Sequence, residues 1–219
     1  MENTVFARRS SLTDRTLSAA AYNLVIGLTL CWGFGINWWI VGHIPVESIR
    51  SINPWLFFGS YFASCMAGIH LFLRSSQPWV SFIGFNLVVV PFGLVVNLVV
   101  SRYDATLVQD AIRITALVTL GMMLLGTLFP RFFASIASAL SVALLLVIIV
   151  ELVEIFLLGI HHGVIDWIVV LIFCGYVGFD WGRANQIPKT LDNAIDSAAA
   201  LYMDIINMFL RILRILGRK

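Results

Sequence analysis

The sequence contains few charged residues. Asp, Glu, Lys and Arg make up only 12% of its 219 residues, about half of the ~25% that is usual in soluble domains. So few charges cannot cover the surface of a water-soluble protein of this length, which excludes an ordinary soluble domain. The formal net charge is only +2, and we predict no nucleic-acid partner.

Motifs of common enzymes are also absent. The sequence has no Walker loop, no nucleophile elbow and no H-E-x-x-H zinc pattern. Its three cysteines, Cys31, Cys65 and Cys174, all lie in apolar runs without a C-x-x-C or Cys/His spacing, which is typical of packing residues. We therefore predict that the protein is not an enzyme and holds no cofactor.

Long apolar runs are what the sequence does contain. Hydrophobic residues make up 60% of the chain, and several runs are long enough to cross ~30 Å of hydrocarbon as helices. We predict an all-α, multi-pass membrane protein that forms one domain over residues 1–219, with the lipid bilayer as its first partner. Seven spans are expected, at residues 19–42, 54–73, 78–100, 107–129, 132–158, 164–183 and 194–216.

The distribution of positive charge predicts a cytoplasmic N-terminus. In that orientation the outer connections carry only Arg50 and Arg102, whereas the inner side carries most of the basic residues. These inner residues are Arg8, Arg9, Arg15, Arg74, Arg131, Arg183 and Lys189. The C-terminal tail, with Arg211, Arg214, Arg218 and Lys219, would lie outside if the last segment crosses, so a re-entrant last segment remains an alternative.

Two aspartates lie within predicted spans, where ionisable residues are costly and usually functional. Asp180 is near the end of the sixth span and Asp204 is about ten residues into the seventh. Both are equidistant from residue 192, so an antiparallel hairpin with its apex there would hold them at one depth. Adjacent carboxylates in a low dielectric share a proton and titrate as a pair. Asn207, one turn beyond Asp204, and Tyr202 are the polar neighbours that would support them.

This pair predicts a pH sensor, or a proton or cation site, with a weak and transient metal-binding capacity. Arg74 ends the second span in the same leaflet and is the expected counter-charge. The alternative is that each aspartate only ties helices together through a neighbouring Arg, Asn or Tyr. We also expect Asp110 and Arg113 to pair within the fourth span.

A weaker candidate site lies towards the outer rim. Glu151 and Glu154 share a face of the fifth span, and they could bind a cation together with His161, His162 and Asp166. The alternative is that these are wetted residues at the membrane interface.

The terminal sequence carries a more specific signal. Leu201-Tyr-Met-Asp-Ile-Ile-Asn-Met-Phe-Leu-Arg-Ile-Leu-Arg-Ile-Leu-Gly217 resembles the terminal signature of the Bax inhibitor-1 family, the transmembrane Bax inhibitor motif family. Gly178-Phe179-Asp180 resembles its second signature, and the 24-residue separation of the aspartates also fits. The similarity is strong over residues 170–217 and looser before them. It suggests a bacterial member, and the short N-terminal segment suggests a prokaryotic cytoplasmic membrane.

The resemblance implies a seven-helix fold whose last helix is wrapped by the other six. It also implies a pH-sensitive calcium leak, in which Asp180 and Asp204 sense pH and Arg74 latches the closed state. In this interpretation calcium ions and protons are the transported or sensed partners. One departure is that Ala63, Ser64 and Cys65 stand where a bacterial relative carries a glutamate, which gives weight to a non-conducting role.

Three other functions are compatible with parts of the pattern. Intramembrane aspartyl proteases also use two aspartates, but their Gly-x-Gly-Asp element is absent here. A proton/cation antiporter could use the same shared-proton pair. An interaction protein that regulates a membrane protease or another membrane partner would keep its function without the aspartates.

Overall fold

The computed structural model describes residues 16–159 and 162–218, and the regular structure in that part of the chain is entirely helical. Some residues to which the sequence analysis gave a place or a role lie outside the described residues. These are Arg8, Arg9, Arg15, His161 and Lys219. The elements in chain order are α1 (Ala19–His43), α2 (Val46–Arg50), α3 (Pro54–Arg74), α4 (Pro78–Val100), α5 (Ala105–Leu128), α6 (Pro130–Val153), the π-helix η1 (Glu154–Leu158), α7 (Gly163–Ala184) and α8 (Leu191–Leu216). The all-α prediction is confirmed, and the long helices match the predicted spans to within about three residues when η1 is counted as the end of α6. The short helix α2 was not predicted.

Six of these helices are long and apolar enough to cross a membrane: α1, α3, α4, α5, α6 with most of η1, and α7. The protein is therefore an integral, multi-pass membrane protein. Helix α8 is not among the six because charged residues interrupt it, although at 26 residues it is ~39 Å long. These residues are Asp192, Asp196, Asp204, Arg211 and Arg214. A full crossing by α8 remains a prediction.

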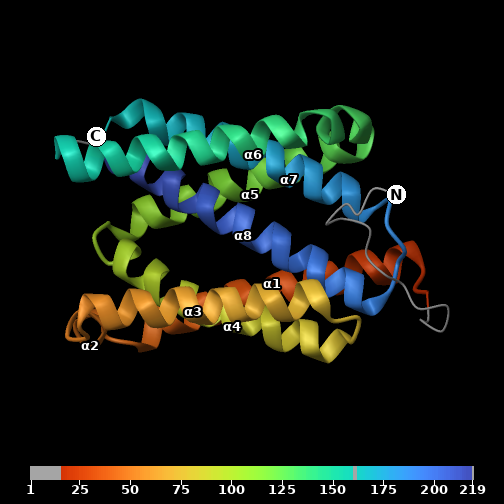
Figure 1. Cartoon of the computed structure of the whole chain (residues 1–219), viewed down its shortest axis with the longest axis horizontal. Helices are drawn as coiled ribbons and strands as arrows, with labels where there is room; N and C mark the ends of the chain where they lie inside the picture. The colour runs from red at the N-terminus through yellow and green to blue at the C-terminus, as the bar shows by residue number, and fades with distance from the viewer. Residues whose placement is uncertain (1–15, 160–161, 219) are drawn as a thin grey trace. The chain divides into compact units, whose positions relative to one another are not determined.

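The chain groups into two compact units, and α8 contributes to both. Unit 1 comprises α1 to α4 with residues 184–200, and unit 2 comprises α5, α6, η1 and α7 with residues 201–219. Figure 1 shows α8 as one unbroken helix. Every residue from 192 to 199 is buried, and because this run exceeds two helical turns, all faces of this stretch of α8 are enclosed. The single-domain assignment stays a prediction.

Close helix packing in unit 1 depends on two glycines. Helices α3 and α4 lie side by side (Figure 1). A Cβ atom on Gly68 would lie 2.4 Å from the Gly84 carbonyl oxygen, and a Cβ on Gly84 would lie 2.7 Å from the Gly68 carbonyl oxygen. Small residues at such a crossing let two backbones approach, which is the usual way that membrane helices gain packing energy.

Pro91 lies inside α4 without ending it. Proline has no N–H, so the carbonyl of Leu87 four residues earlier loses its helical donor. The Ser64 hydroxyl of α3 donates to this Leu87 oxygen at 2.7 Å. Ser64 thus satisfies a polar group that hydrocarbon could not satisfy, and α4 continues through the proline.

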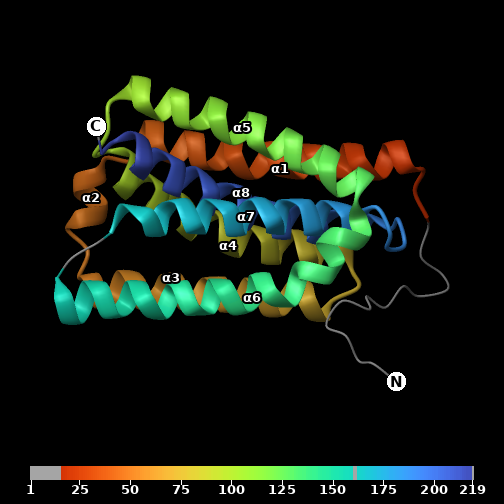
Figure 2. The same cartoon turned by 90° about the horizontal axis from the view of Figure 1, so that it is seen from above.

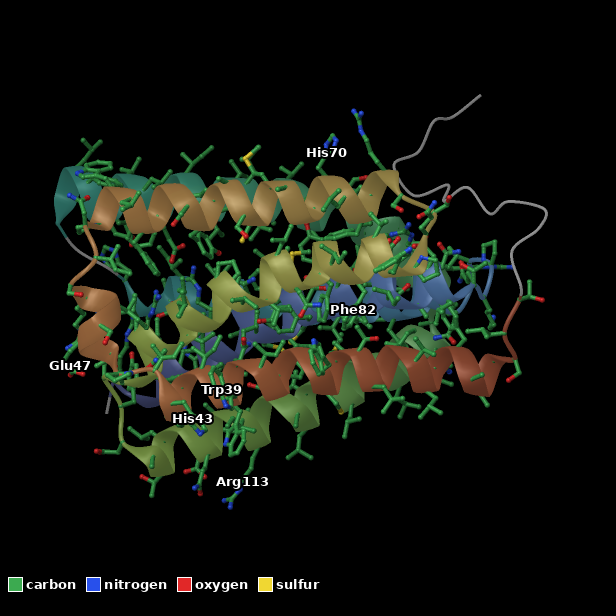
Figure 3. All side chains as sticks on the ribbon, turned by 90° about the horizontal axis from the view of Figure 1, so that it is seen from below. Trp39, His43, Glu47, His70, Phe82 and Arg113 are labelled. Carbon is green, nitrogen blue, oxygen red and sulfur yellow. The ribbon has the colours of Figure 1, made fainter. Side chains whose placement is uncertain are left out.

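Asparagine side chains join helices in unit 1. Asn97 of α4 donates to the carbonyl oxygens of Ile40 and Ile44, at 3.3 and 2.8 Å, and so satisfies acceptors at the C-terminal end of α1. At the same end His43 stacks on Trp39 with ring centroids 5.0 Å apart (Figure 3). Asn97 therefore connects helices, as polar amides commonly do in membranes.

In unit 2, α7 packs closely against α5 and α6. A Cβ on Gly126 of α5 would lie 2.3 Å from the Gly178 carbonyl oxygen of α7, and Gly175 faces Leu140 of α6. Helices α6 and α7 run side by side (Figure 1 and Figure 2). Close packing against α5 and α6 holds α7 in place, and it thereby fixes the position of Asp180 within unit 2.

Candidate functional site

Helix α8 brings most of the site residues to unit 2. Thr190 precedes the first residue of α8, and its hydroxyl accepts from the Asn193 backbone N–H at 3.1 Å. This N-cap, with Asp192 in the first turn, favours a helix start here. From Asp204 the polar residues Asn207, Arg211, Arg214 and Arg218 follow at alternating steps of three and four. This spacing places Asn207, Arg211 and Arg214 on one face of α8 with Asp204, and Arg218 follows just past the end of the helix.

Asp180 and Asp204 meet within unit 2. Asp204 is 93% buried, and the half-buried Asp180 carboxyl lies within electrostatic reach of it. Two ionised carboxylates have no donor between them, so a hydrogen bond between the two would need one shared proton. Among the described residues, the buried Asp204 Oδ2 has no hydrogen-bond partner.

The predicted reason for this meeting is wrong in one respect. Residue 192 is not the apex of a symmetric hairpin, because α8 already begins at Leu191. Asp180 lies about one turn before the end of α7, whereas Asp204 lies more than three turns into α8. The connection over residues 185–190 begins with a turn and spans at most ~20 Å, so α8 need not begin level with the end of α7.

A pocket of about 360 Å³ opens beside Asp204, entirely within unit 2. Asp204, Asn207 and Arg211 of α8 supply three of its polar groups, and Glu151 of α6 and Tyr176 of α7 supply the others. The remaining wall is apolar and consists of Leu144, Val147, Ile148, Val169, Phe173 and Met203. The pocket therefore connects a buried carboxyl with a charged pair through mostly apolar walls.

Of the predicted supporting and latch residues, only Asn207 lines the pocket. Asn207 lines the pocket and donates to the Met203 carbonyl oxygen of its own helix at 2.7 Å. Tyr202 is fully buried but is not a pocket residue. Arg74 ends α3 in unit 1, where its side chain is exposed, and its pairing with the aspartates of unit 2 remains a prediction.

The outer-rim acids are neither free ligands nor simply wetted residues. Glu151 is bound by Arg211. Glu154 is 94% buried, and its carboxylate contacts the ring Nδ1 and backbone N–H of His162 at 2.6 and 3.2 Å. Within residues 16–159 and 162–218, no three His, Cys, Asp or Glu residues are grouped to hold a metal ion.

Sequence reasoning missed the partners of the C-terminal arginines. The fully buried Asp166 carboxylate accepts from Arg211, Arg214 and Arg218 at 3.0, 3.2 and 2.7 Å. From the sequence alone, these arginines bear only on the orientation of the chain in the membrane. The polar spacing along α8 is the signal that could have found them, since it puts the arginines on the face that carries Asp204.

The expected Asp110–Arg113 pair is present at 3.4 Å. Its side chains are 56% and 72% exposed, and Arg113 projects away from the helix (Figure 3). This pair belongs to the surface of α5 and takes no part in the pocket.

Comparison with known proteins indicates the family of the chain. The family model described as "Inhibitor of apoptosis-promoting Bax1" matches residues 14–219. An uncharacterized membrane protein of Streptococcus pyogenes serotype M3 is 29% identical over 133 residues, which cover 58% of this chain and 58% of that relative. An uncharacterized protein of Helicobacter pylori J99 is 27% identical over 162 residues, 74% of this chain and 66% of the relative.

A plant relative extends the similarity beyond bacteria. Protein LIFEGUARD 1 of Arabidopsis thaliana is 37% identical over 79 residues, 34% of this chain and 32% of the relative. The match spans about 58% of the length of the S. pyogenes relatives. It therefore does not assign the activity of a whole relative to this chain. The family model, in contrast, covers nearly the full chain. The chain therefore belongs to the Bax inhibitor-1 family.

Proposed function

We propose that this protein is a pH-sensitive calcium leak in a prokaryotic membrane, with the Asp180–Asp204 pair as its sensor. The observation that carries the proposal is the closeness of these two carboxyl groups, one of them buried, beside a pocket of about 360 Å³. A carboxyl pair that shares a proton changes charge with pH, and the pocket brings a cation within reach of it.

The weakness of the site favours a leak over storage. Calcium takes six to eight oxygen ligands in proteins, and the two aspartates with Asn207 supply only part of such a set. An ion that is held incompletely can leave again, which conduction requires. The mostly apolar walls of the pocket oppose the passage of ions when the protein is closed.

The sign of the pH dependence follows from the charge of the pair. As the pH falls, the pair takes up a proton and loses negative charge. A cationic latch that holds the closed state by attraction to the pair is then weakened, so the leak should rise on acidification.

The test is calcium flux into liposomes that contain the purified protein, measured at several pH values with and without an imposed pH gradient. We expect flux without a proton gradient and an increase of at most about tenfold per pH unit, the limit for one titrating proton. Flux that requires an opposing proton gradient would instead identify an antiporter. No flux under any condition, with correctly folded protein, would contradict the proposal and favour an interaction protein.

Arg74 is the proposed latch, as the family resemblance implies. Arg74→Ala should raise the leak at neutral pH several-fold, on the order of one Coulombic contact of ~1 kcal/mol, and should flatten the pH profile. Arg113→Ala is the matched control because Arg113 is also exposed and pairs with Asp110 of its own helix. An unchanged leak and an unchanged profile in Arg74→Ala would remove Arg74 from the mechanism.

A further inference from the structure

The pocket beside Asp204 offers hydrogen-bond acceptors on three of its lining residues. The buried Asp204 Oδ2 has no hydrogen-bond partner among the described residues. Asn207 uses its Nδ2 to donate to the Met203 carbonyl oxygen, which leaves its side-chain oxygen as an acceptor. The Tyr176 hydroxyl donates to Ser141 Oγ at 3.1 Å, so its oxygen can still accept. All three acceptors belong to residues that line one pocket, which therefore suits a ligand that donates.

The cationic side chain in the same pocket does not serve as this donor. Arg211 binds Glu151 through both Nη atoms and Asp166 through Nη1, so its charge is already compensated by two acids. It lies seven residues beyond Asp204 on α8, which is ~10 Å along the helix axis. A buried acid is costly to leave without a cation or a donor. The Asp204 end of the pocket therefore favours a ligand with a positive charge.

The rest of the wall is apolar and aromatic. Phe173 and Tyr176 of α7 have ring centroids 6.2 Å apart, and both line the pocket together with Leu144 and Val147 of α6. Apolar walls favour a ligand with an apolar body, and a cation near an aromatic face gains a further attraction. The volume of about 360 Å³ is typical of a site for a small organic molecule.

We propose that this pocket binds a lipophilic ammonium compound, with its ammonium group at Asp204 and its aryl or alkyl body against Phe173. An ammonium group has three N–H donors, which match the acceptors of Asp204, Asn207 and Tyr176. The ~10 Å between Asp204 and Arg211 limits the ligand to about the length of a short phenylalkylamine. Binding does not depend on the proposed function, but its consequence rests on it: a filled pocket keeps calcium from the carboxyl pair and so inhibits the leak.

The binding test is titration calorimetry of phenylpropylamine with purified protein in detergent at neutral pH. Phenylpropanol has the same body without the charge, and methylammonium has the charge without the body. We expect the amine to bind at least about tenfold more tightly than phenylpropanol, a difference of ~1.4 kcal/mol, and methylammonium not to bind at the same concentrations. Asp204→Asn should remove the preference for the amine. Asp110→Asn removes an exposed acid of α5 outside the pocket and should bind like the wild type.

Equal binding of phenylpropylamine and phenylpropanol by the wild type would overturn the inference, and so would an unchanged preference in folded Asp204→Asn. Val147→Phe covers the case in which Asp204→Asn does not fold. It keeps every polar group and fills the pocket from a half-buried position on α6. It should weaken amine binding by about tenfold or more, and wild-type affinity in this variant counts equally against the inference.

Calcium flux in liposomes, with the same pH on both sides, separates this inference from the proposed function. If the wild type conducts, phenylpropylamine should lower the leak at concentrations that saturate binding, whereas phenylpropanol should not. An amine that binds without lowering the leak would overturn the inhibitory role. If no form conducts but the amine binds through Asp204, the site stands and the leak proposal fails. If the wild type conducts and the amine neither binds nor inhibits, the inference fails and the leak proposal stands.

Discussion

Calcium flux should lose its pH dependence when either Asp180 or Asp204 is replaced with asparagine, and the double mutant should behave like each single one. The two carboxyls lie within electrostatic reach of each other, so in the proposed mechanism the proton belongs to the pair and one replacement removes the titration. Wild-type flux should vary by up to about tenfold per pH unit, and each variant should give a nearly flat profile.

Thermal unfolding in detergent gives an independent readout of the same three variants. Residues that act as one unit show non-additive effects, whereas separate sites lose stability additively. If the aspartates only tie helices together, each asparagine keeps a hydrogen-bonding side chain and pH-dependent flux persists. Wild-type pH dependence in both single mutants would contradict the shared-proton mechanism.

Asp166→Ala should produce the largest loss of stability of any single replacement in unit 2. Asp166 is fully buried and accepts from three arginines. Removing it leaves several partly buried cations with one acid, and breaking a buried pair in this way costs about 3 kcal/mol or more. The measurement is the free energy of unfolding in detergent, or the thermal midpoint where unfolding is irreversible.

Asp110→Ala is the matched control for this prediction. The chemistry of the substitution is identical, but the Asp110–Arg113 pair is exposed, and exposed pairs contribute ~0.5 kcal/mol or less. An equal free energy of unfolding for Asp166→Ala and Asp110→Ala would mean that the arginine cluster is solvated and does not stabilise the fold. Asp166→Asn should fall between the two because its oxygen still accepts hydrogen bonds.

The spans were predictable because their signals are local. Pro54, Pro78 and Pro130 each stand at the first turn of a helix, where a missing N–H costs least. Pro91 inside α4 is different, since the hydroxyl that compensates for it comes from Ser64. No local pattern could assign that partner.

The candidate site was predictable only in part. The identity of the aspartate pair follows from its place in the terminal motif and from the rarity of ionisable residues in spans. The Glu151–Arg211 pair joins residues 60 positions apart, and its existence depends on how α6 packs against α8. Charge counting along the chain treats Arg211 as one more positive tail residue, and so it misses a guanidinium enclosed by two acids.

The charges of α8 also bear on how the chain enters its membrane. Six helices are apolar enough to partition into a bilayer individually, but each Asp or Arg at the centre of an isolated helix opposes insertion by ~3 kcal/mol. Glu151, Asp166 and Asp180 precede α8 in the sequence, so partners for Arg211 and Asp204 are synthesised first. Assembly therefore has a direction, in which α8 is accommodated after the helices that carry its partners.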